Sequence, residues 1–274
     1  MAADGLGLRD LAGRSPGRPR RRYLPAAALA CLVVGALCLA AAGPARAQDD
    51  VNDPIEPFNR MVFSFNELLD LMFLEPASIV YGHLPSPFRT GVRNVLDNLR
   101  SPVVFANDAM QGEGDRAGVT LARFMINSSI GMLGLFDMAS EFGYPKHHED
   151  FGQTLGRWGT GEGPYLVLPL FGPSSVRDAG GLVVDGFFLD PMAYVAPTDV
   201  RIARSVVDGV DTRYRLDPVI RDLRENSIDR YATFRTVYRQ RRAAEIANGR
   251  SGAPDEAYED IFNEGVDPEP APAP

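Results

Sequence analysis

The chain has 274 residues, of which 28 are Lys or Arg and 36 are Asp or Glu, giving a net charge of −8 at pH 7. This acidic balance argues against a nucleic-acid partner and against electrostatic docking to anionic lipid surfaces, because both carry negative charge themselves. Any contact with a membrane must therefore be chiefly hydrophobic.

Residues 1–47 have the pattern of a secretory signal rather than of a folded element. A basic stretch that contains Arg14, Arg18, Arg20, Arg21 and Arg22 precedes an uncharged run rich in Ala, Leu and Val from Leu24 to Gly43, and Ala45-Arg46-Ala47 follows. This order of basic region, apolar region and small-x-small triplet predicts cleavage between Ala47 and Gln48. The alternative is an uncleaved anchor helix, because about 20 apolar residues can span a bilayer.

Both cysteines, Cys31 and Cys38, lie inside this segment, so cleavage would leave a chain without cysteine. We therefore predict a domain that is stabilised neither by disulfides nor by thiolate metal sites. Lipidation is another use of such a cysteine, and Cys31 is the better candidate, although neither cysteine follows a good Leu-led lipobox. Cleavage would also remove seven basic and two acidic residues, leaving 21 basic and 34 acidic side chains and a net charge of −13.

After a short extension at residues 48–52, residues 53–248 are predicted to form one mainly α-helical domain, with no internal repeat or linker. Residues 249–274 contain seven acidic residues against one Arg and end in Pro-Glu-Pro-Ala-Pro-Ala-Pro. A segment of this composition cannot bury enough apolar surface to offset the entropy of ordering it. We therefore predict a disordered acidic tail.

The domain opens with Asp53-Pro54-Ile55-Glu56-Pro57, an acidic, proline-containing start for a helix that is expected to run to about Glu75 and end at Pro76. Apolar residues cover most of the circumference of this helix. Such a helix needs either deep burial or a lipid neighbour. We nominate six of its residues as membrane-facing or channel-facing, with core packing as the alternative for each: Phe58, Met61, Phe63, Phe65, Leu71 and Leu74.

A second helix is predicted over residues 93–110, and a third from about Asp115 to Phe136. The 13 uncharged residues between Arg123 and Asp137 are too few to span a membrane, so a buried or re-entrant segment is expected. Further helices are predicted over residues 200–214 and 218–247, the last with apolar residues that repeat at close to the helical period.

Residues 151–172 differ in character from the rest of the domain. Five glycines precede Pro164, and the run from Tyr165 to Phe171 is short, apolar and flanked by proline. Such a run fits a strand, a hairpin arm or an extended buried segment. The predicted fold is thus mainly α, with room for one short hairpin near residues 151–172.

The sequence contains little that suggests catalysis or metal binding. His147-His148-Glu149-Asp150 lacks the His-Glu-x-x-His spacing that puts two ligands on one helical face. No Gly-x-Ser-x-Gly elbow is present, and the glycines from Gly159 to Gly163 are not followed by the Gly-Lys-Ser/Thr of a phosphate-binding loop. We therefore predict no catalytic residue, no metal and no cofactor.

Three motifs stand out between residues 53 and 240. They are Asp53-Pro54-x-Glu56-x-Phe58-Asn59-Arg60, Arg123-Phe124-x-x-Asn127, and Phe151-Gly152-Gln153-Thr154-Leu155-Gly156-x-Trp158-Gly159-x-Gly161-x-Gly163-Pro164-Tyr165-x-x-Leu168-Pro169. In this order the set closely resembles the MlaA/VacJ family, and the long glycine motif is the most specific part.

The resemblance implies a single-domain, ring-like helical protein with a central amphipathic channel, set in the outer membrane on its periplasmic side. Members of the family remove glycerophospholipids that have strayed into the outer leaflet, hand them to a soluble periplasmic lipid carrier, and associate with trimeric porins. The chain would then be a transport component and not an enzyme. An envelope lipid hydrolase and a porin-associated structural subunit are the alternatives. Family members are usually lipoproteins, and the weak lipobox at Cys31 departs from that pattern.

The resemblance also implies a gating segment beside the channel. Gly159 and Gly161, with Gly163 after them, match positions that are associated with the flexibility of this segment. Glycine lets the backbone swing without a Cβ clash, so we expect these residues to act as hinges. A static tight turn is the alternative.

Overall fold

The computed structural model describes residues 52–247, which fold mainly into helices. The predicted signal, the candidate Cys31, the cleavage site at Ala47 and Gln48, and the predicted tail lie outside this range. The elements are α2 (Glu56–Leu69), η1 (Asp70–Leu74), α3 (Glu75–Gly82), α4 (Ser86–Met110), α5 (Gly114–Ser129), α6 (Met138–Glu141), α7 (Phe151–Arg157), β1 (Tyr165–Leu168), β2 (Gly172–Ser175), α8 (Val176–Val184), η2 (Asp185–Leu189), α9 (Met192–Val195), α10 (Thr198–Asn226) and α11 (Arg230–Ala247).

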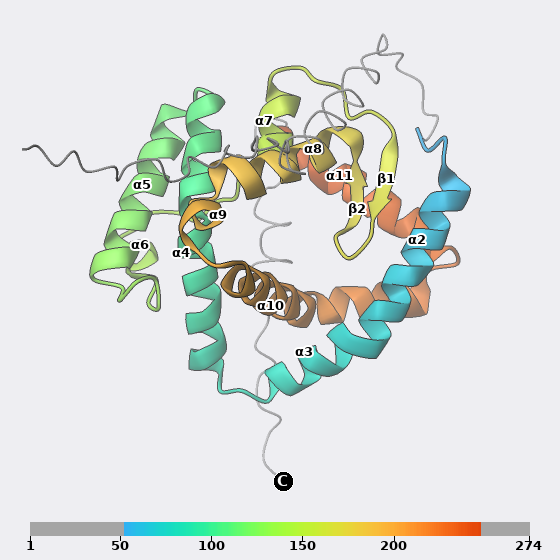
Figure 1. Cartoon of the computed structure of the whole chain (residues 1–274), viewed down its shortest axis with the longest axis horizontal. Helices are drawn as coiled ribbons and strands as arrows, with labels where there is room; N and C mark the ends of the chain where they lie inside the picture. Colours follow the sequence, from blue (N-terminus) through green and yellow to red (C-terminus); the bar gives the residue numbers. More distant parts are fainter. Residues whose placement is uncertain (1–51, 248–274) are drawn as a thin grey trace, which may run out of the picture.

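The elements lie around a ring (Figure 1). Helices α2, α3, α4, α10, α11 and α8 make up most of its circumference, the hairpin of β1 and β2 lies on its inner side, and α5 and α6 lie outside it against α4. The predicted mainly helical fold with one short hairpin is confirmed. The central channel stays a prediction, because the course of the backbone does not define the space that side chains leave open.

The hairpin is fastened to α2 by two asparagines. β1 pairs antiparallel with β2, from Tyr165 opposite Ser175 to Leu168 opposite Gly172. On the other edge of β1, Asn59 accepts from the Val167 N–H at 3.0 Å and donates to the Tyr165 carbonyl at 2.9 Å. Asn66 likewise donates to the Leu168 carbonyl and accepts from the Leu170 N–H, both at 2.9 Å. Seven residues of helix rise about 10.5 Å and three residues of strand about 10 Å, so the two spacings match.

The apolar core is small and lies between the hairpin, α2 and α11. It contains Val62, Phe63, Tyr165, Val167 and Tyr231, with Phe234 and Tyr238 packed against it. The Phe63 ring meets the edges of Tyr231 and Phe234 at centroid distances of 5.7 and 5.5 Å, which is the favoured geometry for aromatic pairs. This cluster fixes the hairpin to the wall of the ring.

The first helix does not end at Pro76, as we expected, but continues through the π-helical turn η1 into α3. The Glu75 N–H bonds the Asp70 carbonyl five residues back. Pro76 therefore falls in the first turn of α3, where a missing N–H costs little. The π turn also brings Asp70 and Glu75 to one side, whereas an α-helix would set them about 140° apart.

Arg213 and Arg224 of α10 bind these two carboxylates. The Asp70 oxygens lie 2.7 Å from Arg213 Nε and 2.6 Å from Arg224 Nη2, and Glu75 Oε2 lies 2.8 Å from Arg224 Nη1. Arg213 is almost fully buried. The shared pair of acids thus joins the η1–α3 wall to α10.

Three other predicted boundaries were wrong. α4 begins at Ser86 rather than Arg93, because Ser86-Pro87 starts a helix well. α10 runs through Pro218 without a break, and its last residue is Asn226. α5 ends at Ser129, not Phe136, because Gly131 and Gly134 allow a tight loop here. Gly134 takes φ +92° and its N–H bonds the Asn127 carbonyl at 2.7 Å.

Close glycine contacts join α7, α8 and α11. A Cβ at Gly181 of α8 would lie 2.8 Å from Gly152 Cα and closer still to Gly152 N, so the two backbones touch. A Cβ at Gly156 would meet the Ile246 side chain of α11 at 2.8 Å. These glycines of the long motif therefore serve packing.

Candidate lipid-contact surface

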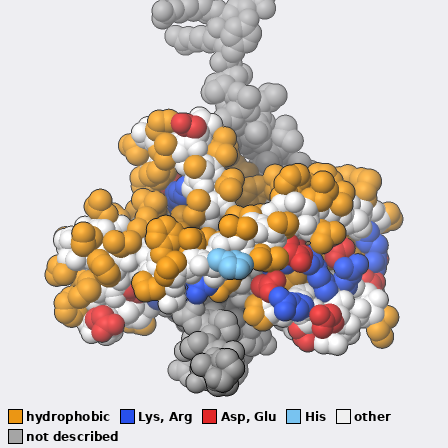
Figure 2. Space-filling view, turned by 90° about the horizontal axis from the view of Figure 1, so that it is seen from below, with side chains coloured by type: hydrophobic (Ala, Val, Ile, Leu, Met, Phe, Trp, Pro, Cys, Tyr) orange, Lys and Arg blue, Asp and Glu red, His pale blue; other side chains and the backbone are white. Residues whose placement is uncertain are grey.

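Among the described residues, many large apolar side chains lie at the surface, and several polar side chains are buried. Phe58 is 53 % exposed, Met61 61 % and Phe73 61 %, and exposed apolar residues occur on nearly every element. Asn59, Asn107, Asp108 and Thr154 are completely buried. Figure 2 shows hydrophobic side chains over much of one face, with the charged side chains gathered mainly at the right. Contiguous apolar surface of this extent marks a site of contact with lipid or protein.

The six nominated residues of the first helix divide into two groups. Phe58, Met61, Phe65 and Leu71 are exposed, which is compatible with contact to a membrane or channel and leaves that role a prediction. Leu74 is partly buried. Phe63 is 9 % exposed and lies in the core, so for this residue the alternative, core packing, describes its place.

The two π-helical turns present further apolar residues that sequence reasoning missed. η1 exposes Met72 and Phe73, and η2 exposes Phe187 and Phe188. Two adjacent apolar residues cannot both lie on the buried face of an amphipathic helix. The adjacent pair Phe187 and Phe188 was therefore the sequence feature that could have indicated an exposed apolar side chain. π turns occur frequently at functional sites in proteins.

A second group of missed residues lies in the loop after α5. Ile130, Met132, Leu133 and Phe136 are all more than half exposed, and Met132 and Leu133 have positive φ, which is uncommon for such residues. Burial is therefore the wrong prediction for these four residues, and the re-entrant alternative stays a prediction. The exposed apolar side chains at the tip of this loop would be favourably covered by an apolar partner.

A polar clasp holds the base of this loop. Asp137 accepts from Arg123 at 2.8 and 3.0 Å and from Asn127 at 2.9 Å, and it caps α6 through the Ser140 N–H. Burial raises the pKa of Asp137, but the bonds from Ser140, Asn127 and Arg123 outweigh it and lower the pKa to about 2. Arg123 and Asn127 of the second motif therefore act in shaping this loop.

The motif His147-His148-Glu149-Asp150 is divided among separate partners. His147 Nε2 lies 2.9 Å from Asp108, Glu149 accepts from Gln111 and Arg116, and Asp150 caps α7 through the Gln153 N–H. Among residues 52–247 no group of three or more His, Cys, Asp and Glu side chains could hold a metal ion. The cluster joins α4, α5 and α7.

Buried charge continues beneath α7. Arg242 of α11 donates to both oxygens of Asp150 at 2.6 Å and to Asp178 at 3.1 Å, while Arg177 also binds Asp178. Burial raises the pKa of the Asp178 carboxyl, but the two arginines outweigh it and hold that pKa well below its ordinary value. Nearby, burial raises the pKa of Asp185 to about 6.

The proposed gate glycines lie after α7 and before β1. Gly159 has φ +88°, its N–H bonds the Gly156 carbonyl, and the Thr160 N–H bonds the Leu155 carbonyl, which is the arrangement of a helix-ending glycine. Gly163 also has positive φ, at +73°. Gly161 lies in open space, with no atom within 4 Å of a Cβ placed there. Gly159 thus has a structural role as a cap, and Gly161 is the better hinge candidate.

No helix among residues 52–247 has the length and apolar character needed to cross a bilayer. The exposed apolar residues are instead spread over many short elements.

Known proteins resemble this chain over most of its length. The family model of the MlaA lipoprotein matches residues 51–245. The intermembrane phospholipid transport system lipoprotein MlaA of Escherichia coli is 34 % identical over 235 residues, which cover 83 % of this chain and 92 % of the relative. Its counterpart in Haemophilus influenzae is 32 % identical, covering 73 % and 81 %. An uncharacterized protein of Rickettsia bellii is 34 % identical, covering 72 % and 78 %.

A solved structure resembles the fold as well. It was determined in work on the structural basis for maintenance of bacterial outer membrane lipid asymmetry, and it superposes with a TM-score of 0.64 at 34 % identity. The match covers 71 % of this chain and 98 % of that one.

Proposed function

Because this chain belongs to the MlaA lipoprotein family, we propose that it is the outer-membrane component of a phospholipid transport system, which removes mislocalised glycerophospholipids from the outer leaflet and so maintains lipid asymmetry. We further propose that residues 1–47 direct export, with cleavage between Ala47 and Gln48. The lipid then passes to a periplasmic carrier, and a trimeric porin holds the protein in place.

The observation that carries this proposal is the exposed apolar surface of α2 and η1. Phe58, Met61, Leu71 and Phe73 expose about half or more of their area on consecutive turns of one wall. In water this apolar surface would favour association with other apolar surfaces, whereas in the hydrocarbon of a bilayer it contacts lipid chains instead. The ring therefore fits a place within one leaflet of a membrane.

Lipid removal needs a shielded path rather than catalytic groups. A phospholipid carries on the order of 30 methylene groups, and at about 0.8 kcal/mol each their exposure to water would cost on the order of 25 kcal/mol. A ring of amphipathic helices can offer apolar surface to the tails and polar groups to the headgroup. An envelope hydrolase is the competing function, and release of fatty acid or headgroup by the purified protein would favour it.

The double substitution Met61→Asp with Leu71→Asp tests the membrane surface. Each charge costs roughly 2–3 kcal/mol in hydrocarbon, so two should lower partitioning into the membrane by on the order of a thousandfold. Flotation of the purified protein with liposomes measures this. Arg221→Asp, on an exposed side chain of α10, is the control and should float as the wild type does. Equal flotation of all three proteins would refute a membrane-embedded wall.

The hinge proposal is tested at Gly161, where alanine and proline differ only in backbone freedom. Alanine meets no neighbour at this position, so Gly161→Ala should leave lipid removal close to normal. Gly161→Pro fixes φ and should reduce removal several-fold if the segment swings. Outer-leaflet phospholipid in cells carrying each variant is the readout. Normal removal with the proline variant would favour a static turn.

A further inference from the structure

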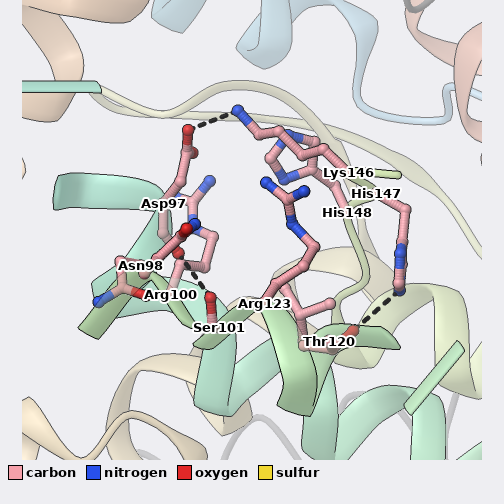
Figure 3. A pocket seen from close by; sticks show the side chains of 11 residues that line it. Asp97, Asn98, Arg100, Ser101, Thr120, Arg123, Lys146, His147 and His148 are labelled. Carbon is pink, nitrogen blue, oxygen red and sulfur yellow. Dashed lines mark hydrogen bonds and ion pairs between the residues drawn. The ribbon is translucent and has the colours of Figure 1, made fainter. Parts of the chain in front are cut away.

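A small polar pocket lies between α4, α5 and residues 146–148, with a volume of about 30 Å³. Asp97, Asn98 and Arg100 line it from α4, Thr120 and Arg123 from α5, and Lys146 from the connecting segment. In Figure 3 these side chains converge on one space, and a dashed line joins Lys146 to Asp97. We refer to it as the Lys146 pocket.

The pocket is basic in an acidic protein. Arg100, Arg123 and Lys146 line it with a single acid, Asp97, and two of the three histidines of the chain lie beside them. Arg100 and Arg123 also pair with Asp208 and Asp137, which do not line the pocket. Lys146 is also the only lysine among the 274 residues, where every other basic side chain except histidine is arginine. A compact ammonium on a flexible stem suits a phosphate as a point charge.

The basic groups have donors to spare among the described residues. Lys146 directs one of its three hydrogens to Asp97, and Arg100 directs one of its five N–H groups to Asp208 at 3.2 Å. Lys146 is 27 % exposed, so a ligand can reach it. Arg123, by contrast, is occupied by Asp137, Ser140 and the Tyr144 carbonyl, and it contributes charge rather than a free donor.

A buried acceptor lies beside this space. Asn98 is 6 % exposed, and its Nδ2 donates to Ser128 at 2.9 Å, but its buried Oδ1 has no hydrogen-bond partner among the described residues. An unpaired buried acceptor costs about 1–3 kcal/mol.

An apolar hollow of about 400 Å³ lies on the same helix. It is lined by Phe124, Met125, Ile126, Ser128 and Ser129, whereas Arg123 and Asn127, which lie one helical turn apart, line the polar pocket from the other face of α5. The apolar hollow and the polar pocket therefore lie on different faces of the same two turns of α5.

We propose that the Lys146 pocket binds the phosphodiester of a phospholipid headgroup, with Lys146 and Arg100 as its ligands. The proposal rests on the proposed function for the presence of phospholipid at this surface. It places a lipid outside the ring, against α4 and α5, in addition to any lipid within it. Such a molecule would be one waiting to enter or one that anchors the α5–α6 lobe.

The single lysine makes the test direct, because reductive methylation of the full-length protein in detergent micelles modifies one side-chain amine. We expect dihexanoyl phosphatidylglycerol, which has no amine, to slow methylation of Lys146 at least fivefold, as measured by mass spectrometry against a lysine-containing reference peptide. Dihexanoylglycerol, which lacks the phosphate, should give no protection. Inorganic phosphate at equal concentration and ionic strength should protect far less, because it lacks the chains.

Two variants should shift the half-protecting concentration of the phospholipid in opposite directions. Arg100→Gln should raise the half-protecting concentration of the phospholipid about tenfold, and Asp97→Asn, which removes the one acid, should lower it. Arg221→Gln on α10 is the control and should leave it unchanged. Opposite shifts at neighbouring positions cannot come from general unfolding.

Each outcome decides between sources of the anion. Protection by the phospholipid alone supports a headgroup site, and equal protection by inorganic phosphate overturns the headgroup in favour of free phosphate. Absence of protection by both overturns the pocket altogether. If the protein floats with liposomes and removes lipid normally while Lys146 stays unprotected, this inference fails and the proposed function stands. If the phospholipid protects Lys146 in a protein that neither floats with liposomes nor removes lipid, the inference stands and the proposed function fails.

Discussion

Replacing Arg242 with leucine is expected to lower the free energy of unfolding by about 3–5 kcal/mol. The arginine binds Asp150 through two hydrogen bonds of 2.6 Å and also contacts Asp178. Its removal takes both of these hydrogen bonds from Asp150 and leaves Asp178 with Arg177 as its arginine partner, and the loss of this charge pairing beneath α7 dominates the effect. Because proteins unfold with a total free energy of about 5–15 kcal/mol, this loss is a large fraction of the stability.

The only tryptophan provides the measurement. Trp158 directly follows α7, its Nε1 donates to the Met110 carbonyl at 3.1 Å, and its ring meets Phe151 edge-on. Its fluorescence in detergent therefore reports undocking of α7 during denaturation. Arg221→Leu, which removes an exposed pair with Asp217 on α10, should change the stability by less than about 1 kcal/mol. A loss below about 1 kcal/mol for Arg242→Leu would mean that Asp150 and Asp178 are solvated.

A methyl group added at Gly181 is expected to lower the free energy of unfolding nearly as much as the loss of Arg242. The new Cβ would lie 2.8 Å from Gly152 Cα, and a backbone cannot yield as a side chain can, so α7 and α8 must move apart. We expect Gly181→Ala to cost about 3 kcal/mol. The same movement would pull Asp178 away from Arg242. The losses of unfolding free energy from Gly181→Ala and Arg242→Leu should therefore be less than additive when the two are combined.

Two other helical glycines provide a matched control. Gly118 of α5 and Gly209 of α10 have no atom within 4 Å of the place that a Cβ would occupy, so alanine meets nothing there. Each substitution should stabilise the protein by about 0.5–1 kcal/mol, since alanine loses less backbone entropy in a helix. Denaturation followed at Trp158 measures the three glycine variants. A similar change in stability at all three positions would show that close packing at Gly181 does not set the effect.

Local patterns were sufficient to predict much of the fold. The acidic, proline-containing start at Asp53, the apolar run before Phe171 and the periodicity of the last helix each reflect forces within a few residues. The apolar circumference of the first helix likewise predicted either deep burial or a lipid neighbour. Phe58, Met61, Phe65 and Leu71 are exposed, and their contact with a membrane or channel stays a prediction.

Features that depend on partners distant in sequence could not be predicted in this way. Phe63 and Phe65 are both aromatic residues of one helix, and only the arrival of Tyr231 and Phe234 places the first in the core. The π turn at Asp70 likewise depends on Arg213 and Arg224, which lie 143 and 154 residues away and bind both of its acids. The Lys146 pocket requires three segments at once, so neither His147 nor Lys146 indicated it by spacing alone.

The fastening of β1 by Asn59 and Asn66 has a consequence for self-association. A two-stranded hairpin normally offers open edges, onto which a strand from another molecule can add. Here amide side chains occupy the outer edge of β1, and Pro173 of β2 has no N–H to offer an incoming strand. Copies of the protein that meet side by side therefore find little open strand edge onto which they could add, although their surfaces expose apolar side chains.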